Sequence, residues 1–293
     1  MKTFAFIINP ISGHGNHSVE ETVRKFLNKH PEVSGEINHT HAPGEATQIA
    51  ADALKRDLIP IAIGGDGTVN EVAKSVIQSG KPMGIIPRGS GNGIARHLGI
   101  PLHLNQALEN LILGEVITID TGLLNEHPFV MLTGVGFDAE IAYKMSISPT
   151  RGLKTYAKLV LKEWRKFKPV ELEMEVDGKP KTESGFMFSF ANASQFGNNF
   201  YIAPQASMKD GLIDVAILKP FPLTAALSIA YRMVAKTIGN SKYMELMKAK
   251  SIRVKTPQGV VNIDGEAVAI NNTLNIQIQP QSLQVIAPKG GLY

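Results

Sequence analysis

Short apolar runs lead into glycine-rich stretches three times in the first third of the chain. The runs lie at residues 4–8, 59–63 and 83–86, and apolar positions with helical spacing follow each glycine-rich loop. A strand that passes through glycines into a helix is typical of the βα units of a parallel sheet. The pattern therefore predicts a doubly wound α/β domain over residues 1–122.

A different pattern begins after about Gly122. Apolar and acidic residues alternate at 170–176, and the turn dipeptide Asp177-Gly178 follows, which predicts a hairpin strand. Further strands are predicted at 185–190, 212–218, 260–263 and 274–279, and helices at 152–167 and 223–238. Residues 123–293 are therefore predicted to form a second, mostly antiparallel β domain. The return of the last strand to the first domain is left open.

Composition narrows the chemistry. The chain has 293 residues and no cysteine, which excludes disulfides, zinc–thiolate sites, iron–sulfur clusters and cysteine nucleophiles. A transmembrane helix needs ~18–20 apolar residues, and Arg232 and Lys236 interrupt the best candidate. The first apolar run is shorter than the core of a signal peptide. We expect a cytoplasmic protein whose only membrane contact is peripheral, and the net charge of +4 suits an anionic partner.

The glycine loops indicate a phosphate site. Backbone N–H groups at the start of a helix attract anions, and loops after neighbouring parallel strands meet at one edge of the sheet. Asp66 lies between Gly65 and Gly67. A carboxylate beside phosphates needs a divalent cation between them, so Asp66 points to Mg²⁺ with a nucleotide. The alternative is that Asp66 only caps a helix. No Walker lysine motif and no dinucleotide-binding glycine motif accompany the loop.

Residues 64–71, Gly-Gly-Asp-Gly-Thr-Val-Asn-Glu, resemble the signature of the diacylglycerol kinase catalytic domain superfamily. Residues 9–13, 40–46 and 87–92 are similar to further segments of that family, in the same order. The resemblance continues into the second half at 210–214 and 264–266. It implies a bacterial soluble lipid kinase, diacylglycerol or sphingosine kinase-like, with an α/β domain like that of NAD kinases and phosphofructokinases, a C-terminal β-sandwich domain that binds the lipid, and ATP between them.

The resemblance also implies roles for single residues. The nucleotide would contact a set from the glycine-rich loops and their neighbours: Asn9, Pro10, Ile11, Ser12, Gly13, Thr40, Gly65, Asp66, Gly67, Thr68, Val69, Asn70, Glu71 and Ser90. Ser207, Asp210 and the carbonyl of Leu212 would hold a structural Mg²⁺. Glu266 would be the catalytic base, with Asp264 as second choice.

Two positions depart from the commoner pattern of the family. His14 stands where many members have a lysine or arginine, and Gly93 stands where many have an aspartate. A neutral imidazole hydrogen-bonds but is no counter-ion for phosphate. Gly93 resembles the form found in sphingosine-kinase-like members, so the acceptor is open.

Local chemistry offers simpler explanations for the acids of the second half. Asp264-Gly265 after an apolar run is a hairpin turn signal, and a turn there would part Asp264 from Glu266. Asp210-Gly211 is likewise a turn signal before a strand. Histidine pairs at 14/17 and 39/41 lack neighbouring ligands, which argues against zinc.

The stretch from Arg151 to Lys168, which contains the helix predicted at 152–167, carries seven basic residues and one acid. Its apolar residues, Trp164 among them, recur every three to four positions, which predicts one apolar face with basic flanks. Such a helix suits a peripheral anionic membrane surface, and the alternative is that the apolar face packs on the β domain. No nucleic-acid partner is expected, because no base-stacking motif accompanies the cations.

The hypothesis is an ATP- and Mg²⁺-dependent lipid kinase of phospholipid metabolism that phosphorylates a hydroxyl of diacylglycerol or a sphingoid base. One alternative is an NAD kinase-like enzyme with a soluble acceptor. Another is a nucleotide-binding regulator without catalysis. An oligomer is left open.

Overall fold

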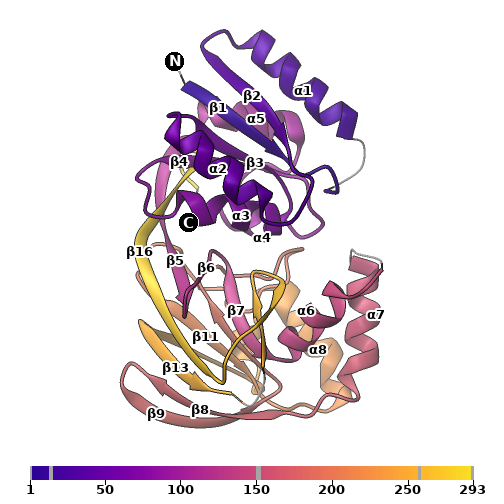
Figure 1. The fold of residues 1–293 in the computed structure, drawn as a ribbon. Helices are drawn as coiled ribbons and strands as arrows, with labels where there is room; N and C mark the ends of the chain where they lie inside the picture. Colours follow the sequence, from indigo (N-terminus) through magenta and orange to yellow (C-terminus); the bar gives the residue numbers. More distant parts are fainter. Residues whose placement is uncertain (1, 13–15, 150–152, 257–258, 292–293) are drawn as a thin grey trace. The chain divides into compact units, whose positions relative to one another are not determined.

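The computed structural model describes residues 2–12, 16–149, 153–256 and 259–291. The chain divides into two compact units, Met1–Ile119 with Gln281–Tyr293, and Asp120–Pro280. Figure 1 draws both units and labels most of their elements.

The first unit is an α/β unit around a parallel sheet with strand order β2-β1-β3-β4-β16. Its elements are β1 (Lys2–Ile8), α1 (Asn16–Lys29), β2 (Val33–His39), α2 (Glu45–Lys55), β3 (Ile59–Gly64), α3 (Asp66–Val76), β4 (Pro82–Pro87), α4 (Gly93–His97), α5 (Leu104–Leu113), the start of β5 (Glu115–Leu124) and the end of β16 (Thr273–Ala287). The three predicted strands are β1, β3 and β4, so that prediction is confirmed.

Both faces of this parallel sheet are buried. Phe4 and Phe6 of β1 join a core with apolar residues of α1 and α5. The alternate residues Ala5 and Ile7 are also fully buried. Successive side chains of a strand point to opposite faces, so helices must cover both faces of the sheet. This arrangement explains why the strand reads as an unbroken apolar run.

The sequence pattern missed β2. Only Val33 of this edge strand is buried, and the rest of β2 is half-buried and mostly polar. An edge strand of this kind carries no apolar run, so periodicity alone does not reveal it.

The second unit is an antiparallel β-sandwich with three α-helices among its described residues, and the predicted fold class is confirmed. Its elements are the end of β5, β6 (His127–Phe129), β7 (Leu132–Gly136), α6 (Phe137–Ser146), α7 (Leu153–Trp164), β8 (Val170–Val176), β9 (Lys179–Gly185), β10 (Met187–Ala191), β11 (Ile213–Leu218), α8 (Leu223–Val234), the short 3₁₀ helix η1 (Ile238–Asn240), β12 (Met244–Ala249), β13 (Ser251–Lys255), β14 (Val260–Ile263), β15 (Glu266–Ala269) and most of β16.

Two sheets enclose the core of the sandwich. One has the order β12-β11-β10-β7-β14-β15, and the other joins β16, β13, β8 and β9. Leu172 of β8 and Val254 of β13 meet Phe188 of β10 and Val215 of β11 in one buried cluster. The alternation predicted at 170–176 is confirmed, because Leu172 and Met174 are buried while their acidic neighbours are exposed.

Helix α7 packs at its end through Trp164, and Phe167 packs just after it. The Trp164 ring lies 5.7 Å from Phe221 and 6.4 Å from Phe186, and Phe167 lies 5.4 Å from Phe137. These contacts pack the C-terminal end of the predicted apolar face on the β domain, whereas Tyr156 of the same face is 42% exposed. Arg151 lies outside the described residues. None of the described helices is long and apolar enough to cross a membrane.

Candidate functional site

The loops after the parallel strands of the first unit are tied together by backbone hydrogen bonds. Asn9, which follows β1, donates its N–H to the carbonyl of Ile63 at 3.0 Å. Arg88, which follows β4, donates to the carbonyl of Gly64 at 2.7 Å, and the buried Thr40 donates to Ile8 at 3.0 Å. The first and third glycine loops and the segment at Thr40 therefore meet the second loop at one edge of the sheet.

Asn9 joins the first loop to the Gly-Gly-Asp-Gly motif through its side chain. Its Nδ2 donates to the hydroxyl of Thr68 at 3.0 Å, and its Oδ1 accepts the N–H of Ile11 at 3.0 Å. The Ile11 side chain is exposed, and the N–H of Ser12 donates to the Asn9 carbonyl at 3.1 Å. Pro10 lies within this turn. Gly13 and His14 lie outside the described residues.

Two glycines of this edge are required by contact between the loops. A Cβ atom on Gly89 would lie 2.5 Å from the Cα of Gly65, and one on Gly65 would lie 3.2 Å from the Cα of Gly89. The space beside Gly64 is taken by the side chain of Thr68. Close packing between the second and third loops is therefore one physical reason for these glycines, independent of any ligand.

The carboxylate of Asp66 points to the start of α4. Its Oδ1 accepts the N–H of Ile94 at 3.3 Å. Burial raises the pKa of the Asp66 carboxyl above its usual range, and hydrogen bonds from the backbone of Gly93, Ile94 and Asn92 oppose that rise. These contacts are those of the capping alternative, and they bind the second loop to the third. Ser90, in that third loop, is exposed.

The rest of the motif holds α3 against α2. Glu71 accepts the N–H of Ala46 at 3.2 Å through Oε2, and its carbonyl accepts the hydroxyl of Thr47 at 2.8 Å. Val69 is buried, and Asn70 is buried with no hydrogen-bond partner for its Oδ1 among the described residues.

The beginning of α3 fits an anionic ligand. The N–H groups in the first turn of a helix have no partner within the helix, and no side chain caps this one. Gly67 and Thr68 lie in that turn. Helix N-termini of this kind bind phosphate through these N–H groups and the helix dipole. The meeting of the loops and the uncapped start of α3 are consistent with a nucleotide phosphate site.

In the second unit, Asp264 and Gly265 form the two-residue turn between β14 and β15. Their φ angles are 49° and 90°, and Ile263 pairs with Glu266 on either side. This is the turn that an Asp-Gly dipeptide predicts. It parts the two candidate acids, because Asp264 is buried whereas Glu266 is exposed.

The buried carboxylate of Asp264 accepts hydrogen bonds from the backbone of residues 130–132. Oδ2 accepts the N–H of Val130 at 2.7 Å, and Oδ1 accepts those of Met131 and Leu132 at 2.8 and 2.9 Å. The carboxylate of Glu266 makes no hydrogen bond or ion pair to another described residue. Of the two acids, Glu266 is thus the one whose oxygens are free to take a proton.

Sequence reasoning missed Asp138, a fully buried acid in the first turn of α6. Burial raises the pKa of its carboxyl to about 7. Oδ2 accepts the Nδ2–H of Asn262 at 3.3 Å, whereas Oδ1 has no hydrogen-bond partner among the described residues. The Oδ1 of Asn262 in turn accepts the N–H of Gly265 at 2.8 Å. A chain of contacts therefore joins Asp138 to the turn that precedes Glu266. The sequence signal is weak, because the mainly apolar stretch 129–142 contains two acids, Asp138 and Glu140.

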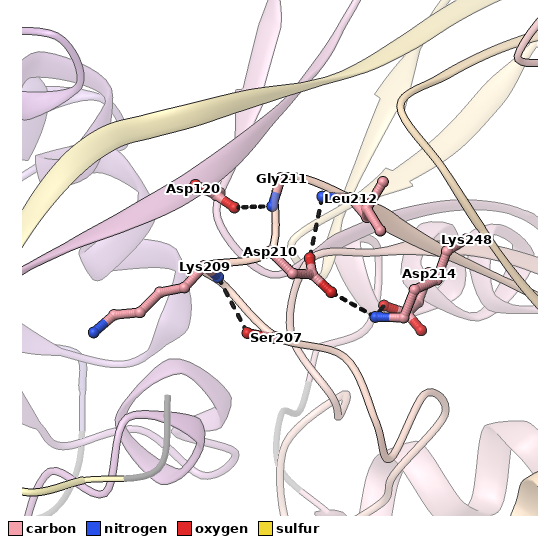
Figure 2. A network of polar contacts seen from close by, with 8 residues as sticks. All are labelled: Asp120, Ser207, Lys209, Asp210, Gly211, Leu212, Asp214 and Lys248. Atoms are coloured by element: carbon pink, nitrogen blue, oxygen red, sulfur yellow. Dashed lines mark hydrogen bonds and ion pairs between the residues drawn. The ribbon is translucent and has the colours of Figure 1, made fainter.

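The expected magnesium set lies at the start of β11 (Figure 2). Asp210 accepts the N–H of Leu212 at 3.1 Å through Oδ1, as a turn aspartate does. Ser207 accepts the N–H of Lys209 at 3.3 Å through its hydroxyl. Asp120, which sequence reasoning missed, accepts the N–H of Gly211 at 2.8 Å through Oδ2.

Lys248 supplies a positive charge beside Asp210. Its Nζ lies 2.6 Å from Oδ2 of Asp210 and 3.2 Å from Oδ2 of Asp214. One carboxylate, one hydroxyl and one carbonyl are ligands that Mg²⁺ accepts. The ammonium already neutralises that carboxylate, so these residues as arranged do not fit an ion. No group of three or more His, Cys, Asp or Glu residues suited to a metal occurs within the described part of the chain.

Comparison with known proteins covers both units. Residues 3–124 match the family "Diacylglycerol kinase catalytic domain", and residues 132–287 match "YegS C-terminal NAD kinase beta sandwich-like domain". A protein of Bacillus subtilis named diacylglycerol kinase is 31% identical over 91% of this chain and 90% of its own length. An uncharacterized protein of Synechocystis is 30% identical over 98% of this chain and 70% of its own.

The fold has solved counterparts. The crystal structure of a diacylglycerol kinase from Bacillus anthracis superimposes with a TM-score of 0.78, at 21% identity, over 99% of this chain and 98% of that one. At that identity the likeness concerns the fold. Together with the two family matches and the Bacillus subtilis relative, it leads to one conclusion: the chain belongs to the diacylglycerol kinase family with a YegS-type C-terminal domain.

Proposed function

We propose that this protein is an ATP- and Mg²⁺-dependent lipid kinase that transfers the γ-phosphate to a hydroxyl of diacylglycerol or a sphingoid base. The observation that carries the proposal is that the likeness to a relative named diacylglycerol kinase spans both units, and not the nucleotide-type unit alone. A protein that shared only the first unit would give no reason to infer a lipid acceptor.

The first unit is the proposed nucleotide-binding unit. The N–H groups at the start of α3 would bind phosphate oxygens, and Asn9 would order the first loop through Thr68. The rest of the proposed contact set is residues 10–13, Thr40, Gly65 to Glu71 and Ser90. Bound ATP with Mg²⁺ supplies the phosphoryl group and offsets its charge. Asp66, whose Oδ1 accepts the Ile94 N–H, would hold the second and third loops in their relative positions.

Glu266 is the proposed base. Phosphoryl transfer to an alcohol needs a carboxylate that takes the hydroxyl proton. Glu266 is exposed at the start of β15, just after a turn whose backbone is held by Asn262. Asp264 accepts three backbone N–H groups, which favours a positioning role for it. Glu266 would remove the proton from the hydroxyl of the acceptor.

The test is a panel of acceptors with radiolabelled ATP. Diacylglycerol, a sphingoid base and NAD are each offered with and without Mg²⁺, in mixed micelles where the acceptor is a lipid. We expect label in a lipid only when Mg²⁺ is present. Label that moves only into NAD would make the protein an NAD kinase-like enzyme with a soluble acceptor.

A protein that binds ATP but labels no acceptor would instead be a nucleotide-binding regulator. Thermal unfolding with ATP distinguishes that outcome from a failure to bind nucleotide. Because the substrate is a lipid, we also propose peripheral contact with an anionic membrane. Lys158 and Lys162 of α7 and Arg165 just after it are exposed and support that contact.

A further inference from the structure

Helix α8 carries a stripe of exposed large apolar side chains. Leu223 is 54% exposed, Leu227 85%, Tyr231 72% and Val234 49%. These positions are separated by four, four and three residues, so they lie along one face of the helix. We call these four residues the α8 stripe.

The stripe belongs to a helix with little anchoring in its own unit. Ile229 is the one buried residue of α8. Amphipathic helices of folded proteins normally turn their apolar stripe toward the core. A contiguous exposed apolar face usually marks a place where another surface binds.

The charge around α8 indicates that a surface binding the α8 stripe would be anionic. No acid occurs between Asp214 and Glu245, whereas Lys219, Arg232, Lys236 and Lys242 lie in that interval. Helix α7 is close by, because Trp164 near its end contacts Phe221 just before α8 at 5.7 Å. Cations on and after α7 are exposed and take part in no ion pair with described residues: Lys158, Lys162, Arg165, Lys166 and Lys168.

We propose that the α8 stripe inserts into the interface of an anionic phospholipid bilayer, with the cations of α7 on the lipid phosphates. Apolar side chains enter the boundary between headgroups and acyl chains, and basic residues beside them add attraction for anionic lipids. The biological purpose of such docking rests on the proposed lipid kinase function, since it would bring the enzyme to its acceptor. The binding itself does not depend on catalysis. It also differs from the expectation for α7, because Trp164 of that helix packs on Phe221 and Phe186.

The experiment measures flotation of the full-length protein with vesicles of phosphatidylcholine alone or mixed with phosphatidylglycerol, without nucleotide. The test variant is Leu227→Ser with Tyr231→Ser. The matched control is Leu113→Ser with Val116→Ser, two exposed apolar residues of the first unit. We expect the wild type and the control to float with the anionic vesicles and the test variant to bind at least tenfold more weakly. High salt should weaken binding of the wild type.

Equal flotation of the test variant and the wild type overturns the proposal, as does no flotation of the wild type. Light scattering of the same protein variants tests the alternative that the α8 stripe binds a second copy of this chain. A wild-type dimer that the test variant converts to a monomer would assign the stripe to a second copy of this chain and overturn the bilayer. Failure of the kinase proposal would give a different result: flotation would persist, but no lipid would be labelled. Thermal unfolding of both variants checks that each is folded.

Discussion

Asp264 and Leu132 are joined by two hydrogen bonds that run in opposite directions. The N–H of Leu132 donates to Oδ1 of Asp264 at 2.9 Å, and the N–H of Asp264 donates to the carbonyl of Leu132 at 2.9 Å. The aspartate thus holds the start of β7 beside the turn that leads to Glu266. Asp264 belongs to a motif expected to be catalytic, but its carboxylate holds the backbone in place.

Replacing Asp264 by alanine should therefore lower stability first. Three N–H donors would lose their acceptor, and an unsatisfied buried donor costs about 1–3 kcal/mol. We expect Asp264→Ala to lower the free energy of unfolding by at least about 3 kcal/mol in urea titrations. Unchanged stability together with lost activity would contradict this role and favour Asp264 as a base.

Glu266→Gln should affect turnover and spare nucleotide binding. The amide keeps the shape of the side chain but cannot accept the proton, so we expect kcat to fall at least ~100-fold. The dissociation constant for ATP, measured by calorimetry, should match that of the wild type. Glu171→Gln on β8 is the matched control, since it removes the charge of another exposed glutamate. Equal turnover in Glu266→Gln and the control would exclude Glu266 as the base.

Asp138 should make stability depend on pH. Its folded pKa is raised to about 7, so the folded state holds a proton that the unfolded state releases near pH 4. The stabilising contribution is complete below about pH 4 and is lost as the pH rises to about 7, a change of about 4 kcal/mol. Asp138→Asn removes this titration.

The measurement for Asp138 is urea unfolding of wild type and Asp138→Asn across that pH range. The difference in their unfolding free energies should move in favour of the variant as pH rises. A difference that does not vary with pH would mean that Asp138 titrates at its ordinary value.

Removing Lys248 should make the carboxylate of Asp210 available to Mg²⁺. Lys248→Met removes the ammonium that lies 2.6 Å from that carboxylate. We expect the variant to melt at a lower temperature than the wild type without Mg²⁺, and Mg²⁺ to raise its melting temperature more than that of the wild type. Lys250→Met is the control, and sodium chloride at matched ionic strength separates screening from binding. No response specific to Mg²⁺ in Lys248→Met would argue against Ser207, Asp210 and Leu212 as ligands.

Gly89→Ala tests the contact between the second and third loops. The new Cβ would lie 2.5 Å from the Cα of Gly65, so the two loops must separate. We expect a loss of about 1–3 kcal/mol in stability and weaker ATP binding. Gly259→Ala is the control, because its Cβ would meet no atom within 4 Å. Unchanged ATP affinity in Gly89→Ala would separate the loop contact from nucleotide binding.

The sequence by itself determined the parts of this protein that local chemistry encodes. Strands β1, β3 and β4 are apolar throughout because both faces are buried, and that property is visible as a continuous run. The turns at Asp177-Gly178 and Asp264-Gly265 are encoded by dipeptides that tolerate positive φ. The polar edge strand β2 lacked any such local signal.

Only the tertiary structure decided what the acids do. Asp264 meets the N–H of Val130 across a sequence separation of 134 residues, and Asn262 meets Asp138 across 124. Asp66 accepts a hydrogen bond from α4, and Asp210 forms an ion pair with Lys248. A motif states which residue stands in a turn, but its hydrogen-bond partner depends on which distant strand or helix packs beside it. Burial, which raises the pKa of Asp138, likewise exists only once those distant segments have come together.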